Sequence, residues 1–338
     1  MLCYFLFFIF FFLTFFSEIQ LEGIREDLGL SQVSAFAPGT RLNLWSQWKA
    51  FIMFCLYFNF DWLPASQQVI ALFAQFLSRS LRSIASVRNY ISGVKLLHVL
   101  LDQPCRVFDD VKLSLAIRGM IRNKAHITRQ ALPITIDILC KIYSYLDMSM
   151  PNHVVFWSLF TMAFFTMARK SNLVVTSLKP PFKCIRRQDV LWGNDCLIVT
   201  FRWSKTNQYG NRVHSVPLVS MRGSPLCPVQ AYRNMCSIFQ VKPDAPAFCM
   251  IKSKGVLPVT YYDLQCFLRE ILHVLGYNSH LYSSHSFRRG AASLAFKSGV
   301  PARLIQAWGD WSSDAYKEYI HLDVSDKVSA IKLMYAKC

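Results

Sequence analysis

Apolar residues recur every three or four positions over residues 40–128, which predicts a bundle of helices. Four helix starts stand out, because serine, threonine and aspartate cap helices and proline suits their first turn. The predicted starts are Thr40, Pro64, Ser83 or Ser86, and Asp109-Asp110. The positions predicted to face the core are Leu44, Trp48, Phe51, Ile52 and Cys55, then Val69, Ile70, Phe73, Phe76 and Leu77, then Tyr90, Ile91, Val94, Leu97 and Leu101, and finally Val111, Leu115, Ile117 and Ile121. This segment is therefore predicted to form a compact helical domain.

Residues 130–338 mix two periodicities, so both helices and strands are predicted there. The predicted helices cover 135–146 and 152–168, start at Pro228, Thr260 and Ser284, and include short helices at 301–307 and 312–319. The predicted strands cover 189–191, 196–203 and 212–218. Strands and helices do not alternate as βαβ units, so a parallel sheet is not expected. The predicted fold class is mainly α with a small antiparallel β-sheet (α+β).

The predicted domain boundary lies between residues 128 and 129, in a basic stretch from Arg118 to Arg129 that reads as a linker. Pro133 marks the start of the next domain. We therefore expect a helical domain over 24–128 and a mixed domain over 129–338, preceded by an apolar, non-domain segment over 1–23.

The first sixteen residues are almost wholly apolar and rich in phenylalanine. A helix of that length spans about 24 Å, less than the roughly 30 Å of a bilayer's hydrocarbon core. Neither a basic region nor a small-residue cleavage site accompanies it. We interpret this segment as a non-native start, such as translated non-coding sequence, with a signal anchor as the alternative. The apolar run at 154–168 is also short, so a buried helix is favoured over a membrane span.

The chain has a formal net charge of +17, which favours a polyanionic partner, either nucleic acid or an anionic membrane surface. Its eleven cysteines form no CxxC pair or metal-ligand cluster, which is typical of reduced thiols in an intracellular protein. The GxxxxGK[ST] phosphate loop and the HExxH metal motif are absent from the sequence. Four basic residues on polar faces of the first domain are either phosphate contacts or solvated charges: Arg79, Arg82, Arg88 and Lys95.

Two isolated cations lie in contexts that suit phosphate chemistry. Arg169 follows the apolar helix directly, where a rigidly held guanidinium could bind a phosphate through two nitrogens. Alternatively, its charge simply interacts with the negative, C-terminal end of the helix dipole. Lys205 lies at the tip of the predicted hairpin, where it could protonate a leaving alkoxide or be an ordinary turn lysine.

A second group of candidates lies near the C-terminus. His285 and Arg288 are three residues apart in the first turn of a predicted helix capped by Ser284, where free N–H groups and the dipole favour an anion. The indole of Trp311 could donate to a phosphate oxygen, although a single tryptophan is more often part of a core. The phenol of Tyr319 is the group of this set that can attack phosphorus and leave a covalent ester.

The order and contexts of these residues resemble the tyrosine recombinase (phage integrase) family. The resemblance rests on Ala168-Arg169-Lys-Ser-Asn-Leu, Ser-Lys205-Thr, His285-Ser-Phe-Arg288-Arg-Gly-Ala and Trp308-Gly-Asp-Trp311-Ser-Ser-Asp-Ala-Tyr-Lys-Glu-Tyr319-Ile. Ser-His-Ser-Phe-Arg-Arg-Gly and Trp-Ser-Ser-Asp-Ala-Tyr look most like recombinases of eukaryotic DIRS- and Crypton-type mobile elements. The resemblance covers about residues 40–338 and implies a SAM-like core-binding domain followed by a catalytic domain.

What the resemblance implies is a metal- and ATP-independent DNA recombinase with no cofactor. Tyr319 would form a 3′-phosphotyrosyl link, Arg169 and Arg288 would bind the scissile phosphate, and Lys205 would protonate the 5′-oxygen. His285 and Trp311 would also contact the phosphate, and His285 would help to take the tyrosine proton. The resemblance also implies that the protein binds double-stranded DNA, acts in a tetrameric synapse of identical chains and is located in the nucleus.

Some residues depart from the family pattern. Arg289 stands where many members have histidine, and Asn172 where an acidic residue is common. The interval from Trp311 to Tyr319 is eight residues, one shorter than in many relatives, which makes Tyr316 a rival nucleophile. A type IB topoisomerase-like activity and a catalytically idle, transposon-derived DNA-binding protein remain alternatives to strand exchange.

A terminal amphipathic helix is also predicted. Val324, Val328, Ile331 and Met334 fall at helical spacing. Such a helix docks onto another protomer or folds back in cis, and the sequence leaves both alternatives open.

Overall fold

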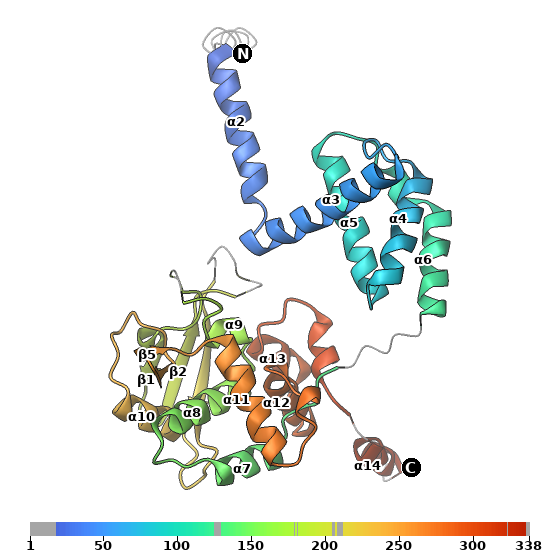
Figure 1. The fold of residues 1–338 in the computed structure, drawn as a ribbon. Helices are drawn as coiled ribbons and strands as arrows, with labels where there is room; N and C mark the ends of the chain where they lie inside the picture. Colours follow the sequence, from blue (N-terminus) through green and yellow to red (C-terminus); the bar gives the residue numbers. More distant parts are fainter. Residues whose placement is uncertain are drawn as a thin grey trace, which may run out of the picture. The chain divides into compact units, whose positions relative to one another are not determined.

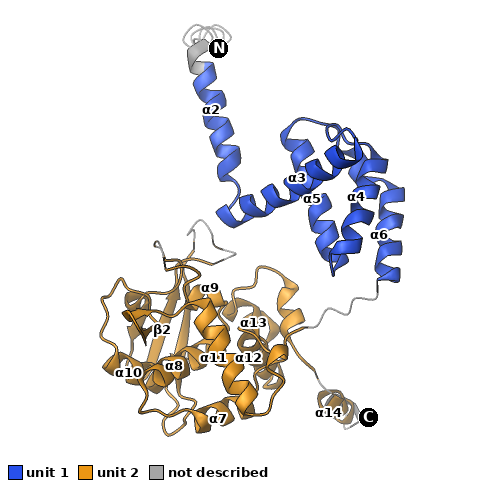
Figure 2. Ribbon diagram, viewed as in Figure 1, with its two compact units in different colours: residues 1–128 blue, residues 129–338 orange. Residues whose placement is uncertain are grey.

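The computed structural model of the chain describes residues 18–124, 130–178, 180, 182–204, 207, 212–322 and 324–335. The chain divides into two compact units, residues 1–128 and 129–338, each with its own hydrophobic core (Figure 2). Both are mainly helical, and the second contains small antiparallel sheets, so the predicted fold class is confirmed. In the described part of the chain, no helix is long and apolar enough to cross a membrane. The apolar segment 1–16 lies outside the described residues.

Unit 1 is built from helices and one short 3₁₀ turn (Figure 1). They are α2 (Glu18–Ser34), α3 (Pro38–Phe58), α4 (Gln67–Ser80), α5 (Ile84–Leu100), η1 (Arg106–Asp109) and α6 (Val111–Asn123). The helix α2 was not predicted from the sequence. Two predicted starts were wrong: α3 begins at Pro38, before Thr40, and α4 begins after Ser66 instead of at Pro64, because the Ser66 hydroxyl accepts the Val69 amide at 3.3 Å.

The other two helix starts of unit 1 are set by side-chain caps, as predicted. Ser83, not Ser86, caps α5 by accepting the Ala85 amide at 3.1 Å, and Asp110 caps α6 by accepting the Lys112 amide at 2.6 Å. The core face of α6 was predicted correctly at Ile117 and wrongly at the other positions. Its buried residues are Leu113, Ile117 and Met120. Phe76, Leu101, Val111, Leu115 and Ile121, all predicted to be inward, are exposed.

The α3 and α5 helices pack closely at Gly93. A β-carbon at this position would lie 1.9 Å from the Gln47 amide oxygen, so a larger residue would have to displace the buried Gln47 side chain, and the Trp48 indole donates to the Gly93 carbonyl at 2.7 Å. On the polar surface of the same unit, Arg79, Arg82 and Arg88 are exposed. The fourth candidate phosphate contact there, Lys95, pairs with Asp109 at 2.8 Å.

The other elements of unit 2 pack around the buried helix α8, which contacts α10, β4 and α12 (Figure 1). Its helices are α7 (Ile136–Tyr145), α8 (Pro151–Phe165), α9 (Lys170–Leu173), α10 (Pro228–Ile238), α11 (Tyr261–Val274), α12 (His285–Lys297), α13 (Ala302–Trp308) and α14 (Val324–Tyr335). The 3₁₀ turns are η2 (Arg187–Asp189), η3 (Ser279–Leu281) and η4 (Asp314–Tyr319). The predicted starts of α7, α10, α11 and α12 are confirmed within a residue.

The α8 helix ends earlier than the predicted 152–168. It ends at Phe165, where the Thr166 hydroxyl donates back to the Met162 carbonyl at 2.7 Å and Met167 adopts a left-handed backbone with φ of 51°. Arg169 therefore does not lie at the end of this helix. It lies four residues beyond Phe165, in extended backbone at the N-cap of α9.

A three-stranded antiparallel sheet of β1 (Val190–Trp192), β2 (Cys196–Phe201) and β3 (His214–Val219) packs against α10 through β3 (Figure 1). Val199 in the central strand pairs with Val190 and Val216, and all three are buried. These strands confirm the predicted ones, although β2 ends two residues early. The hairpin of β4 (Cys249–Lys252) and β5 (Gly255–Pro258) was not predicted.

The α12 helix lies unusually close to the chain that enters unit 2. The Ile134 amide donates to the Ser286 carbonyl at 3.0 Å, and a β-carbon on Gly290 would lie 1.7 Å from the Ile134 carbonyl oxygen. Glycine is therefore required at this crossing. After α12, Gly299 has φ of 77° and turns the chain toward α13.

The terminal helix α14 keeps apolar side chains exposed. Val324, Val328 and Ile331 are all at least 45 % exposed. The helix is joined to α12 by an ion pair between Lys297 and Asp326 at 2.8 Å.

Candidate active site

The first turn of α12 carries His285 and Arg288. The helix begins after Ser284, so the two residues lie one turn apart near its amino end, where unpaired amides favour an anion. They differ in environment, since Arg288 is 1 % exposed whereas His285 is at the surface. This places one buried and one accessible cation-forming side chain at the same helix end.

Arg288 is a fully buried arginine, and no carboxylate of the described residues forms an ion pair with it. Its guanidinium carbon lies 3.6 Å from the centre of the Trp311 ring, and one terminal nitrogen donates to the Met167 carbonyl. Its Nε and other terminal nitrogen make no hydrogen bond within 3.5 Å among the described residues, while the nearby Tyr319 phenol acts to raise its pKa. Burial lowers the pKa of Arg288 to about 9, and the nearby charge of Arg169 acts in the same direction.

Arg169 reaches the same place from the segment after α8. Its Nη1 lies 3.3 Å from Oδ2 of Asp310, and its Nη2 donates to the Asp310 carbonyl at 3.2 Å. The side chain is 16 % exposed. Asp310 also acts to raise the pKa of Arg288, so its carboxylate lies near both guanidinium groups. The structure therefore brings the two predicted phosphate-binding arginines together.

The segment 311–321 folds back over the start of α12. The Ser293 hydroxyl of α12 accepts the His321 amide at 2.7 Å, donates to the Arg289 carbonyl at 2.8 Å and lies 3.4 Å from the Tyr319 carbonyl. These bonds hold the Tyr319 ring 5.2 Å from the Trp311 ring, 6.3 Å from the His285 ring and 5.2 Å from the Arg288 guanidinium carbon. Tyr319 thus lies among three of the other candidates.

Tyr316, the rival nucleophile, has a different environment. It is 6 % exposed and belongs to the hydrophobic core, with its ring 6.3 Å from Trp311. Tyr319 is only partly buried and borders a hollow of about 320 Å³ that His285, Arg289 and Gln130 also line. A bulky substrate therefore has an approach to the phenol of Tyr319.

The positive charges around His285 affect its protonation. Desolvation lowers the pKa of His285, and the charges of Lys170, Arg288 and Arg169 lower it further. Lys170 is held nearby, with its ammonium 3.4 Å from the centre of the Tyr261 ring. The lowered pKa favours the neutral imidazole, which can accept a proton.

Five of the six predicted site residues lie together in this way. The sixth, Lys205, lies outside the described residues. Its sequence neighbour Ser204 is described, and the Ser204 hydroxyl donates to Oδ2 of Asp310 at 2.7 Å.

Sequence reasoning missed three residues of this site: Asp310, Arg212 and His214. Arg212 pairs with the Asp310 carboxylate, and His214 Nε2 lies 3.0 Å from the Trp308 carbonyl. Burial lowers the pKa of His214. The available signal was an acidic residue between Trp308 and Trp311, because a charge flanked by two large apolar residues is expected to be buried and paired.

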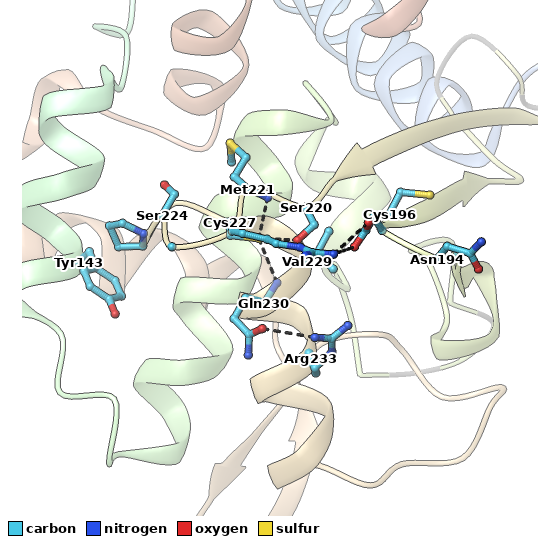
Figure 3. A pocket seen from close by; sticks show the side chains of 15 residues that line it. Tyr143, Asn194, Cys196, Ser220, Met221, Ser224, Cys227, Val229, Gln230 and Arg233 are labelled. Carbon is cyan, nitrogen blue, oxygen red and sulfur yellow. Dashed lines mark hydrogen bonds and ion pairs between the residues drawn. The ribbon is translucent and has the colours of Figure 1, made fainter.

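A separate hollow of about 770 Å³ lies at the amino end of α10 (Figure 3). Its lining includes Cys227, whose sulfur accepts the Met221 and Gln230 amides at 3.2 and 3.4 Å. Burial acts to raise the pKa of this thiol, but these hydrogen bonds outweigh it and lower the pKa. None of the five predicted catalytic residues that the structure describes lines this hollow.

No protein-family model matches the chain, and no curated protein sequence matches it. Solved structures do. Tn1549 transposon integrase in complex with transposon right end DNA matches with a TM-score of 0.54 and 13 % identity, over 80 % of this chain and 85 % of that one. A lambda integrase dimer bound to a COC' core site matches with a TM-score of 0.52 and 14 % identity, over 88 % of this chain and 94 % of that one.

XerH site-specific recombinase, bound to a palindromic difH substrate after cleavage, gives a TM-score of 0.52 and 16 % identity, over 80 % of this chain and 70 % of that one. This chain has the fold of the tyrosine recombinases and integrases. The likeness includes both the core-binding and the catalytic domain of the integrases. At 13–16 % identity it is a likeness of fold, and the role of each side chain rests on the geometry described above.

Proposed function

We propose that this protein is a site-specific recombinase or integrase that cuts a DNA strand through a 3′-phosphotyrosyl intermediate and exchanges strands. The observation that carries the proposal is the Arg288 guanidinium, which is buried against Trp311 and Tyr319 with two nitrogens unpaired among the described residues. Burying a cation whose N–H donors lack acceptors is unfavourable in free energy unless an anion accepts hydrogen bonds from them. A phosphodiester beside Tyr319 would do so.

In the proposed step, the Tyr319 oxygen attacks the scissile phosphorus, a tyrosyl–phosphorus bond forms, and the bond to the 5′-oxygen breaks. Arg169 and Arg288 stabilise the charge that builds on the non-bridging oxygens, and Trp311 donates to one of them. Neutral His285 takes the phenolic proton, and Lys205 protonates the 5′-oxygen. A 5′-hydroxyl from a second strand then attacks the phosphotyrosine and reverses the step, so no metal, nucleotide or other cofactor is needed.

The remaining parts of the proposal concern partners and origin. Unit 1 would bind double-stranded DNA as the core-binding domain, with exposed Arg79, Arg82 and Arg88 contacting phosphates. Strand exchange would take place in a tetrameric synapse of identical chains. The motif resemblance to DIRS- and Crypton-type recombinases supports an origin in a eukaryotic mobile element and action in the nucleus. The net charge of +17 favours binding to DNA, which is a polyanion.

A suicide DNA substrate tests the proposal, because a nicked strand that diffuses away traps the covalent adduct. The wild-type chain should form the adduct, Tyr319→Phe should abolish it, and Tyr316→Phe should retain it because Tyr316 is in the core. An undiminished adduct in Tyr319→Phe would contradict the assignment of the nucleophile. Plasmid relaxation without any recombinant product would instead indicate a topoisomerase-like activity, and DNA binding without an adduct would indicate an idle DNA-binding protein.

A further inference from the structure

Asp310 is a buried acid at the centre of the candidate site. It follows α13 and Gly309, its side chain is 7 % exposed, and its backbone adopts the left-handed region with φ of 55°. Such a backbone favours glycine and is tolerated by aspartate and asparagine. A buried carboxylate in this conformation is retained only where its side chain has partners.

The Asp310 carboxylate joins three separate segments of unit 2. Oδ2 accepts from the Ser204 hydroxyl at 2.7 Å and lies 3.3 Å from Nη1 of Arg169, while Oδ1 pairs with Arg212. Ser204 follows β2 and Arg212 precedes β3. The Asp310 carboxylate therefore also holds the end of β2 and the start of β3 next to Arg169.

The hold on Arg169 is bidentate. Nη1 faces the carboxylate, and Nη2 donates to the Asp310 backbone carbonyl at 3.2 Å, which fixes the plane of the guanidinium. Two of its five N–H donors point to Asp310 in these bonds, which leaves donors for another acceptor. The negative charge of Asp310 also offsets part of the repulsion between Arg169 and Arg288, because Arg169 acts to lower the pKa of Arg288 whereas Asp310 acts to raise it.

We propose that Asp310 is a positioning residue, which orients the Arg169 guanidinium toward the scissile phosphate and ties Ser204 and Arg212 to the same point. This inference rests on the proposed DNA cleavage and adds to it a residue that does not touch the substrate. Misplacing a binding group by a fraction of its contact distance is costly in a reaction that depends on charge stabilisation.

Asp310→Asn tests the inference, because asparagine keeps the shape and tolerates the left-handed backbone but lacks the charge. On a suicide substrate, adduct formation in a single turnover should slow by about 10- to 100-fold, the usual effect of losing such a supporting contact. Asp195→Asn is the matched control, since Asp195 is an exposed acid paired with Arg222 at 2.9 Å. It should cleave at the wild-type rate.

A methylphosphonate at the scissile position separates positioning from general damage to the fold. Replacing a charged oxygen by methyl removes the charge that Arg169 would neutralise, so the gap between Asp310→Asn and wild type should shrink on this substrate. Combining Asp310→Asn with Arg169→Ala should slow cleavage no further than Arg169→Ala alone. Full additivity, an equal loss on both substrates, or wild-type cleavage by Asp310→Asn would overturn the proposal.

A second measurement does not depend on catalysis. In ¹⁵N-arginine-labelled protein, the Arg169 guanidinium held by Asp310 should rotate slowly and show separate signals for its Nη atoms. The variant Arg169→Lys identifies these signals by removing them. In Asp310→Asn the guanidinium should rotate faster, so the separate signals should merge. Unchanged Arg169 signals in Asp310→Asn would overturn the positioning role. A wild-type chain that forms no adduct would contradict the proposed function instead, and the signals would still decide whether Asp310 holds Arg169.

Discussion

The guanidinium carbon of Arg288 lies 3.6 Å from the centre of the Trp311 ring and 5.2 Å from that of Tyr319. The indole face attracts the cation and so recovers part of the hydration that Arg288 loses on burial. The stacking also fixes the plane of the guanidinium while leaving Nε and one Nη unpaired among the described residues. Trp311 therefore orients Arg288 as well as bordering Tyr319.

Replacing Trp311 tests this orientation. Trp311→Leu should slow adduct formation on a suicide substrate by about 10- to 100-fold, because the guanidinium loses its platform next to the phenol. Trp192→Leu is the matched control, since Trp192 stacks under Arg233 at 5.5 Å on the surface of the same unit. It should leave the rate unchanged. Equal rates in both variants would show that the Trp311 platform is dispensable.

The buried charge of Arg288 should reduce the stability of unit 2 in the absence of DNA. A buried charge without a carboxylate in direct contact among the described residues is unfavourable, and even buried ion pairs can be replaced by apolar side chains with a gain of about 1–4 kcal/mol. Arg288→Met should therefore keep or raise the free energy of urea unfolding while abolishing the DNA adduct. Arg222→Met, at an exposed pair, should change the free energy of unfolding by less than about 0.5 kcal/mol. A large loss of stability in Arg288→Met would show that the arginine is primarily structural.

Local signals were sufficient to predict most elements of this fold. Capping residues such as Thr135, Thr260 and Asp110 set helix starts within a residue, because their side chains bond to nearby amides. The choice of core face on α6 was wrong because two apolar stripes compete on that helix. Packing against α4 decides between them, and that is a tertiary effect.

The site was only partly accessible to sequence reasoning for a similar reason. His285, Arg288 and Tyr319 carry recognisable chemistry, so they could be named from local context and motif resemblance. Asp310 acts through residues 98 to 141 positions away along the chain, as its bonds to Arg212 and Arg169 show. No local pattern reports such a contact.

The titration of His285 should reflect the positive charges around it. Desolvation and the charges of Lys170, Arg288 and Arg169 lower its pKa below the ordinary 6.5. The unfolded chain then takes up this proton at a higher pH than the folded chain does, so the contribution to stability is present above pH 6.5 and is lost as the pH falls through the lowered folded pKa.

An NMR titration of the imidazole measures this directly, with His285→Gln to identify the signal. The midpoint should lie below 6.5, and Lys170→Met should raise it by removing the largest of the charge effects. Lys141→Met is the matched control, because the Lys141 ammonium also lies over a tyrosine ring, that of Tyr277, at 5.4 Å. A wild-type midpoint at or above 6.5, or an equal response to both lysine variants, would contradict the electrostatic account.

The crossing at Gly290 should be the least tolerant point of the site's scaffold. A β-carbon there would lie 1.7 Å from the Ile134 carbonyl oxygen and 3.0 Å from the Phe164 ring, so Gly290→Ala must push α12 away from its neighbours. Overpacking of this kind costs about 1–3 kcal/mol, and the shift would carry His285 and Arg288 with it.

Hydrogen exchange can locate that cost, since each unit has its own core. Gly290→Ala should speed amide exchange in α8, which packs on α12, and leave α4 of unit 1 unchanged. Gly119→Ala is the control, because no described atom beyond its chain neighbours and its own helix backbone lies within 4 Å of its would-be β-carbon, and alanine favours the helix by up to about 1 kcal/mol. If Gly290→Ala leaves exchange in α8 at the wild-type rate, α12 does not approach Ile134 this closely in solution, and the placement of Arg288 beside Trp311 loses its structural basis.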